Sequence, residues 1–241
     1  MYSALALIAS MLLFEATHLD LGIQSLFYDF QMNHWLVDRN NYLLKFIFYD
    51  GIKALYLLSI IAIIIGLLFL GNKDWVSQNR QGLLIVCASL ILVPLLVGIL
   101  KAVTNVPCPR DLQIFNGVYP YITLTGSYPP GFEQPGNAQC FPAGHASGGF
   151  AFMSLFFLFK DKKQRVTALL CAIGVGWTIG SYKTLIGDHF VSHTMISMIF
   201  AWMITSIIAH LLTRFPFSRR SGSATSQVQA ARLSFDNSSV L

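Results

Sequence analysis

The stretch GLLIVCASLILVPLLVGIL, residues 82–100, decides the class of fold because it contains no Lys, Arg, Asp or Glu. A helix needs about 20 apolar residues to cross the hydrocarbon core of a membrane, with a lower limit near 17. Residues 54–70 and 191–212 have the same character. These three stretches predict three membrane-spanning helices.

The composition agrees with a membrane protein: 54% of the 241 residues are hydrophobic and 11% are charged, whereas a soluble domain has about 25% charged residues. Shorter apolar stretches at residues 2–14, 146–159 and 166–182 are bounded by polar residues, as helix ends are. The first could be a cleaved signal peptide, but it lacks the basic start and the small-residue cleavage pattern of one. We therefore predict an all-α, polytopic membrane bundle of about six transmembrane helices.

Lys and Arg are distributed unequally between the two ends of such a bundle. Cytoplasmic loops are enriched in both residues, so the richer end, which also holds both chain termini, is assigned to the cytoplasm and the other end to the periplasm of a bacterial inner membrane. The residues of the cytoplasmic end are Lys73, Arg80, Lys160, Lys162, Lys163, Arg165, Arg214, Arg219, Arg220 and Arg232.

The chain is predicted to form one membrane domain, residues 1–217, followed by a tail, residues 218–241. The tail has few large apolar residues and is expected to be a disordered cytoplasmic segment. The net charge of +5 is explained by the topogenic residues. No basic stripe interleaved with aromatic residues is present, so a nucleic-acid partner is not expected.

Two long loops, residues 15–51 and 101–144, lie on the periplasmic side in this predicted topology. Residues 19–30 mix apolar and polar side chains and predict either a helix lying along the membrane interface or a plain connector. The second loop contains Cys108 and Cys140. An oxidising periplasm would permit a disulfide between them, and two free thiols are the alternative.

The first of three polar motifs is KAVTNVPCPRD, residues 101–111, at the periplasmic end of the span 82–100. Lys101 by itself could be a lysine that extends its ammonium group from the helix end into water. Arg110, which follows two prolines, is harder to explain in that way. The pair predicts a cationic patch at this membrane surface.

The second motif is CFPAGHASGGF, residues 140–150, in which a Pro-Ala-Gly turn places His145 at the start of a helix. A helix N-terminus has free N–H groups and a positive dipole end, which suit an anion such as phosphate. The small residues around His145 would let the backbone approach a ligand closely. Tight packing between helices is an equal alternative explanation for them.

The third motif is GSYKTLIGDHFVSH, residues 180–193, which contains Lys183, Asp188, His189 and His193. Ionisable groups at membrane depth cost about 2.5–3.5 kcal/mol each on insertion scales and mark functional sites. His189 and His193 are four residues apart and would share one helix face, as in a zinc site. The neighbouring candidates are mainly cations, which would repel a divalent metal, so no metal and no other cofactor are expected.

The order Lys…Arg, Pro-x-Gly-His and Lys-x5-His resembles the three-part signature of the type 2 phosphatidic acid phosphatase superfamily. In that family the motifs read approximately Lys-x6-Arg-Pro, Pro-Ser-Gly-His and Ser-Arg-x5-His-x3-Asp. Its membrane members have six helices with the site at one face. The resemblance covers residues 101–193, and PAGH followed by GDHFVSH is its most specific part.

This resemblance implies a role for each matched residue. His189 would be the nucleophile that forms a phosphohistidine, and His145 would be the general acid that protonates the leaving group. Lys101, Arg110 and Lys183 would hold the phosphoryl oxygens, with the Gly144 backbone N–H as a further donor. Phosphoryl transfer needs such positive groups around the phosphorus and a nucleophile in line with the leaving group.

The chain departs from the family pattern in its phosphate-binding residues. Eight residues separate Lys101 from Arg110, and proline precedes the arginine instead of following it. Ala143 replaces a serine, and Ser147 could supply the missing hydroxyl. Lys183 stands where arginine is usual, which keeps the charge and loses the bidentate fork.

A further departure concerns the residue that orients the nucleophile. His193 stands where the family has an aspartate, and a neutral His193 could accept a hydrogen bond from Nδ1–H of His189. Asp188 adjoins His189 but would project about 100° away on a helix. We therefore predict that His193 has the orienting role and that Asp188 is at most accessory.

The sequence thus predicts hydrolysis of a phosphomonoester or pyrophosphate on a membrane lipid. A lipid phosphotransferase would use the same intermediate and pass the phosphoryl group to an acceptor other than water. A transporter or a catalytically inactive membrane partner are alternatives from other classes. The lipid headgroup and the oligomeric state stay open.

Overall fold

The computed structural model describes residues 2–214, and most of these are helical. The helices and strands, in chain order, are α1 (Tyr2–Ala16), α2 (Leu19–Ser25), β1 (Tyr28–Asp29), β2 (His34–Trp35), α3 (Tyr42–Lys45), the π-helical turn η1 (Phe46–Gly51), α4 (Ile52–Phe69), α5 (Asp74–Thr104), the 3₁₀ turns η2 (Pro109–Asp111) and η3 (Gln113–Phe115), α6 (Gly144–Ala151), the 3₁₀ segment η4 (Phe152–Phe157), α7 (Lys162–Leu185) and α8 (Val191–Arg214).

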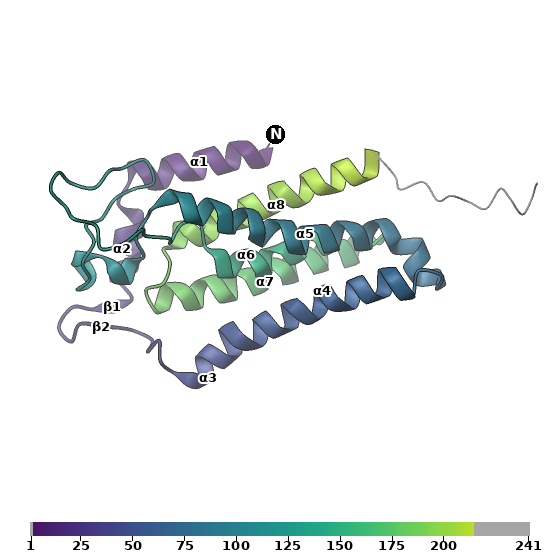
Figure 1. Cartoon of the computed structure of the whole chain (residues 1–241), viewed down its shortest axis with the longest axis horizontal. Helices are drawn as coiled ribbons and strands as arrows, with labels where there is room; N and C mark the ends of the chain where they lie inside the picture. Colours follow the sequence, from purple (N-terminus) through teal and green to yellow (C-terminus); the bar gives the residue numbers. More distant parts are fainter. Residues whose placement is uncertain (1, 215–241) are drawn as a thin grey trace, which may run out of the picture.

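The long helices run side by side along one axis (Figure 1). Within residues 2–214, four helical segments are long and apolar enough to cross a membrane: residues 42–69, 74–111, 162–185 and 191–214. A fifth crossing is obtained if α1 and α2, which are bent by 71° relative to each other, are counted as one span. The structure therefore has a membrane-type helical bundle, and the count of six crossings stays a prediction.

The predicted span at residues 146–159 has a mixed conformation. The α-helical part ends at Ala151, and η4 continues it with 3₁₀ geometry. Eight α-helical residues rise about 12 Å and six 3₁₀ residues also rise about 12 Å, so the segment is shorter than the hydrocarbon core of about 30 Å. It lies inside the bundle, where Phe150 and Met153 are buried.

The core lies between α5, α6, α7 and α8 and includes Leu90, Phe150 and Ala201. Gly149 and Gly176 allow α6 and α7 to approach closely, because a Cβ on Gly149 would lie 2.8 Å from Cα of Gly176. Small residues permit such contacts between membrane helices, where van der Waals packing takes the place of the hydrophobic effect. This packing holds the second half of α6 against the middle of α7.

The helix that contains α4 begins earlier than the sequence indicated. Residues 15–51 were predicted to be a loop, but helical structure begins at Tyr42, where the Asn41 side chain accepts a hydrogen bond of 3.1 Å from the Leu44 N–H. Lys45 and Asp50 interrupt the apolar pattern that defined the span, and both are exposed at the end of the bundle. The predicted interfacial helix at residues 19–30 is the shorter helix α2, followed by the hairpin β1–β2.

The polar motifs gather at one end of the bundle, where α5 and α7 end, α6 and α8 begin, and β1 and β2 lie (Figure 1). Lys73, Lys162 and Arg214 lie at the other end, at the start of α5, the start of α7 and the end of α8. This separation matches the predicted distribution of charge. The predicted tail at residues 218–241 lies outside the described residues.

Candidate active site

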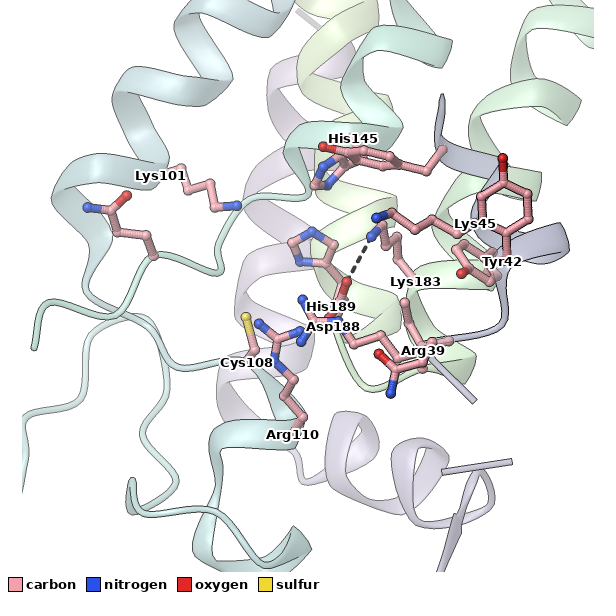
Figure 2. Close-up of a pocket in the computed structure, with 15 residues that line it drawn as sticks. Arg39, Tyr42, Lys45, Lys101, Cys108, Arg110, His145, Lys183, Asp188 and His189 are labelled. Carbon is pink, nitrogen blue, oxygen red and sulfur yellow. Dashed lines mark hydrogen bonds and ion pairs between the residues drawn. The ribbon is translucent and has the colours of Figure 1, made fainter. Parts of the chain in front are cut away.

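A cavity of about 640 Å³ opens at the end of the bundle that holds the polar motifs. Its lining comes from all three motifs and also from the segment before α4 (Figure 2). The lining residues are Arg39, Asn40, Tyr42, Lys45, Tyr49, Lys101, Cys108, Arg110, Gln139, His145, Tyr182, Lys183, Ile186, Asp188 and His189.

His145 and His189 face each other in this cavity, with ring centroids 6.3 Å apart. His145 lies in the first turn of α6, and no side chain caps that helix. The first N–H groups of a helix have no acceptor within the helix, so they are available to an anion. The Tyr49 ring lies 4.9 Å from the His145 ring and borders it on the side of α4.

His189 lies in the turn between α7 and α8 and not on a helix. Gly187 lies in this turn with φ of +74°, a conformation that favours glycine. The prediction that His189 and His193 share a helix face is therefore wrong, because α8 begins only at Val191. Burial holds the pKa of His189 well below its ordinary value, and the neighbouring His193 acts in the same direction.

The short helix α2 holds both sides of the turn that carries His189. Gln24 is fully buried and donates through Nε2 to the Thr184 carbonyl at 2.8 Å, at the end of α7. The Asp20 carboxylate accepts from the Ser192 N–H at 3.1 Å and from the Ser192 hydroxyl, at the start of α8. These two contacts restrict the turn and thereby the position of the His189 ring.

The structure does not join His193 to His189 by a hydrogen bond. Their ring centroids are 5.8 Å apart, and Nδ1 of His193 is buried with no hydrogen-bond partner in the described part of the chain. The His193 ring packs against Phe141 and Phe190, and it does not line the cavity. The predicted orienting contact is thus absent, because His193 points into the packing beneath the site.

The His189 ring contacts a sulfur atom through Nδ1. Nδ1 of His189 lies 3.4 Å from Sγ of Cys140, which is joined by a disulfide to Cys108. A disulfide sulfur has no proton to donate, so the contact fits a ring with hydrogen on Nδ1 and a free lone pair on Nε2. That tautomer is the one in which Nε2 can act as a nucleophile.

Asp188 was expected on a helix, but it lies in the turn between α7 and α8. Its carboxylate pairs with Nη1 of Arg110 and, at 2.8 Å, with Nζ of Lys183 (Figure 2). The Arg110 backbone N–H also donates to the Gly187 carbonyl at 3.0 Å. Asp188 therefore connects the first and third motifs and fixes two of the expected phosphate-binding cations.

The disulfide between Cys108 and Cys140 connects the first and second motifs, with a Cα–Cα distance of 5.1 Å. Cys140 also lies close to His189 and His193, so that potential ligand atoms of the three lie within 4.8 Å of one another. Zinc sites use thiolate sulfur, and the Cys140 sulfur is engaged in the disulfide. The cluster therefore lacks the ligand set of a zinc site.

Three further predicted residues, Lys101, Gly144 and Ser147, lie on α5 and α6. Lys101 lies in the last turn of α5 and lines the cavity. Gly144 is the first residue of α6, beside the Lys101 side chain. Ser147 is buried, and its hydroxyl donates to the Gly144 carbonyl at 2.7 Å, so the structure does not bring it to the cavity.

Sequence reasoning missed the contribution of the segment before α4. Arg39, Tyr42, Lys45 and Tyr49 line the cavity although they come from what was predicted to be a loop. One feature of the sequence could have indicated this contribution. Arg39 and Lys45 are cations at the end of the bundle that is otherwise poorer in Lys and Arg. Only the folded arrangement shows that these cations lie beside the histidines.

The fold and the site define a class: a helical membrane-type protein with two facing histidines in a cation-rich cavity at one end of the bundle. The model of the PAP2 superfamily matches residues 82–216, more than half of the chain, and the chain belongs to this superfamily. Members of the family are phosphatases, which indicates phosphatase-type activity on phosphorylated substrates. Comparison with curated proteins and with solved structures finds no significant match.

Proposed function

We propose that the protein hydrolyses a phosphate ester or pyrophosphate on a membrane lipid through a phosphohistidine, without a metal. The observation that carries this proposal is the pair of facing imidazoles, 6.3 Å apart, in a cavity that also contains Lys101, Arg110 and Lys183. Positive groups around a phosphoryl group stabilise the charge on its equatorial oxygens in the transition state.

His189 is the nucleophile in this proposal. Burial keeps its imidazole neutral, and the contact of Nδ1 with the Cys140 sulfur leaves Nε2 free to attack phosphorus. As the N–P bond forms, the bond from phosphorus to the leaving oxygen breaks, and that oxygen receives a proton from His145. Water then attacks the phosphohistidine, His145 takes a proton from it, and inorganic phosphate leaves.

The two histidines have different electrostatic requirements. His145 must carry a proton when the leaving group departs, but burial, followed by the nearby ammonium groups of Lys183 and Lys101, lowers the pKa of His145 to about 4. A bound phosphate dianion supplies compensating negative charge. We therefore expect His145 to become protonated together with substrate binding, so that the acid is formed only in the occupied site.

The position of the cavity relative to the apolar helices supports a lipid as the substrate. The cavity lies at the end of apolar helices, and large side chains of α4 such as Leu55, Leu58 and Ile61 are exposed. A substrate with its phosphate in the cavity would have its apolar part beside these surfaces. We propose six crossings, cytoplasmic termini and a site on the periplasmic face of a bacterial inner membrane, from the distribution of Lys and Arg.

The test is phosphate release by the purified full-length protein in detergent with phosphorylated lipids. His189→Ala should abolish turnover, and His145→Ala should accumulate a phosphorylated protein with substrates that have good leaving groups. His210→Ala, an exposed histidine near the other end of α8, is the matched control and should retain activity. Full activity of His189→Ala would exclude the proposed mechanism.

A further inference from the structure

The cations of the cavity come from two parts of the chain. Lys101, Arg110 and Lys183 belong to the region that matches the family model, residues 82–216. Arg39 and Lys45 come from the segment before α4, outside that region, and both line the same cavity. The second group therefore adds positive charge to a site that already has the family's phosphate-binding cations.

The two groups differ in their ion pairs. Asp188 pairs with Arg110 and Lys183, whereas neither Arg39 nor Lys45 forms an ion pair within residues 2–214. The closest acidic neighbour of Arg39 in sequence, Asp38, is engaged with its own turn, since its carboxylate accepts from the Asn40 N–H at 2.8 Å. Two exposed cations thus face the cavity with their charge available to an incoming anion.

Helix stability does not explain these positions. Arg39 and Lys45 flank the start of the helical segment at residues 42–69, and cations near a helix N-terminus are disfavoured by the helix dipole. Lys45 extends from this segment towards Lys183, and Arg39 lies on the same side of the cavity (Figure 2). Like charges that converge on one cavity are expected where the ligand is an anion of more than one charge.

The segment is also held in place. Asn41 caps the start of α3, and Tyr49, which follows Lys45 by one helical turn, lies against the His145 ring and 5.0 Å from the Lys183 ammonium. Trp35 packs against Gly187, at the turn that carries His189, so tightly that a Cβ on Gly187 would lie 2.4 Å from the indole. The second group of cations is therefore positioned relative to both histidines.

We propose that Arg39 and Lys45 form a subsite for a second phosphate group, so that the preferred substrate is a lipid diphosphate. This rests on the proposed function. The terminal phosphoryl group lies between the histidines and the first group of cations, and the inner phosphate lies against Arg39 and Lys45. A cavity of about 640 Å³ has room for both groups.

The reaction then has a distinct leaving group. Nε2 of His189 attacks the terminal phosphorus, the P–O bond of the bridge breaks, and its electron pair goes to the bridging oxygen of a lipid monophosphate. His145 gives its proton to this oxygen, and Arg39 and Lys45 stabilise the negative charge on the other oxygens of the departing monophosphate. Water hydrolyses the phosphohistidine to inorganic phosphate and restores His189, so no other reactant is consumed.

The test compares initial rates with dodecyl diphosphate and dodecyl monophosphate, which share one alkyl chain. Arg39→Gln and Lys45→Gln should each lower kcat/KM for the diphosphate by about tenfold to a hundredfold, the range for hydrogen bonds to charged groups. The monophosphate should change less than about twofold. Lys162→Gln, an exposed lysine at the other end of the bundle, is the control for loss of charge.

A second measurement does not depend on turnover. Inorganic pyrophosphate should raise the Tm of His189→Ala protein more than orthophosphate does, and this difference should disappear when Arg39→Gln and Lys45→Gln are added. Equal losses for both alkyl substrates, or an unchanged difference in Tm, would refute the subsite. A wild-type protein that hydrolyses neither substrate would refute the proposed function, and the Tm comparison would still decide whether the subsite exists.

Discussion

Removal of the disulfide between Cys108 and Cys140 should loosen the loop that joins the first two motifs. The bridge closes a loop with a sequence separation of 32 residues. The loop-entropy model gives about 3.7 kcal/mol at 25 °C for a loop of this length. One kcal/mol shifts the Tm of a domain of 150–250 residues by about 2–4 °C, so the expected loss is about 7–15 °C.

The perturbation is the double variant Cys108→Ala and Cys140→Ala, and thermal unfolding in detergent is followed by tryptophan fluorescence. Mass spectrometry with a thiol-alkylating reagent checks that the wild-type bridge is present. The matched control is Cys87→Ala with Cys171→Ala, because these cysteines are free in the structure. The control should retain the wild-type Tm within about 2 °C.

The same double variant should also lose activity. Arg110 and His145 each lie within five residues of a bridged cysteine, and Cys140 contacts the His189 ring. We expect kcat/KM to fall by at least about tenfold, which corresponds to about 1.4 kcal/mol of transition-state stabilisation. A Tm within about 2 °C of wild type, together with unchanged activity, would refute the conclusion that the bridge organises the site.

Three further outcomes are expected. Asp188→Asn should lower kcat by about tenfold or more in the phosphate-release assay, because Arg110 and Lys183 lose their shared carboxylate; unchanged kcat would contradict this role. Asp20→Asn should lower the free energy of unfolding by about 0.5–2 kcal/mol, since the carboxylate caps the start of α8, and an unchanged Tm would argue against it. Burial keeps the pKa of His189 low, so as pH falls below about 6.5 the unfolded chain takes up a proton that the folded protein does not. The Tm should therefore fall with pH in that range, less steeply in His189→Gln protein, and equal slopes would be evidence against a neutral buried ring.

Much of the site could be predicted because its residues are ionisable, and ionisable residues are rare next to a membrane-spanning segment. Lys183, Asp188 and His189 lie within a few residues of one another beside an apolar span, where ionisable groups are costly. Their presence therefore indicated function without any knowledge of contacts. The structure places these three residues and His145 in one cavity.

The contacts among these residues were harder to predict. The sequence predicted that Asp188 and His189 lie on a helix. It also predicted that His189 and His193 share one face of that helix, since they are four residues apart. Gly187 instead allows a turn with positive φ between α7 and α8. The turn directs Asp188 to Arg110 and leaves His193 in the packing beneath the site.

By itself, the sequence determined that the chain is helical and suited to a membrane, and it identified the histidines and cations of the three motifs. These properties depend on composition and on the spacing of nearby residues, and both can be read from a short segment without knowledge of its tertiary contacts. The tertiary structure alone decided that Arg39 and Lys45 join the cavity, that Asp188 connects two motifs and that α2 restrains the turn of His189. Such contacts join residues far apart in the chain, and only the packing of the helices brings them within reach of one another.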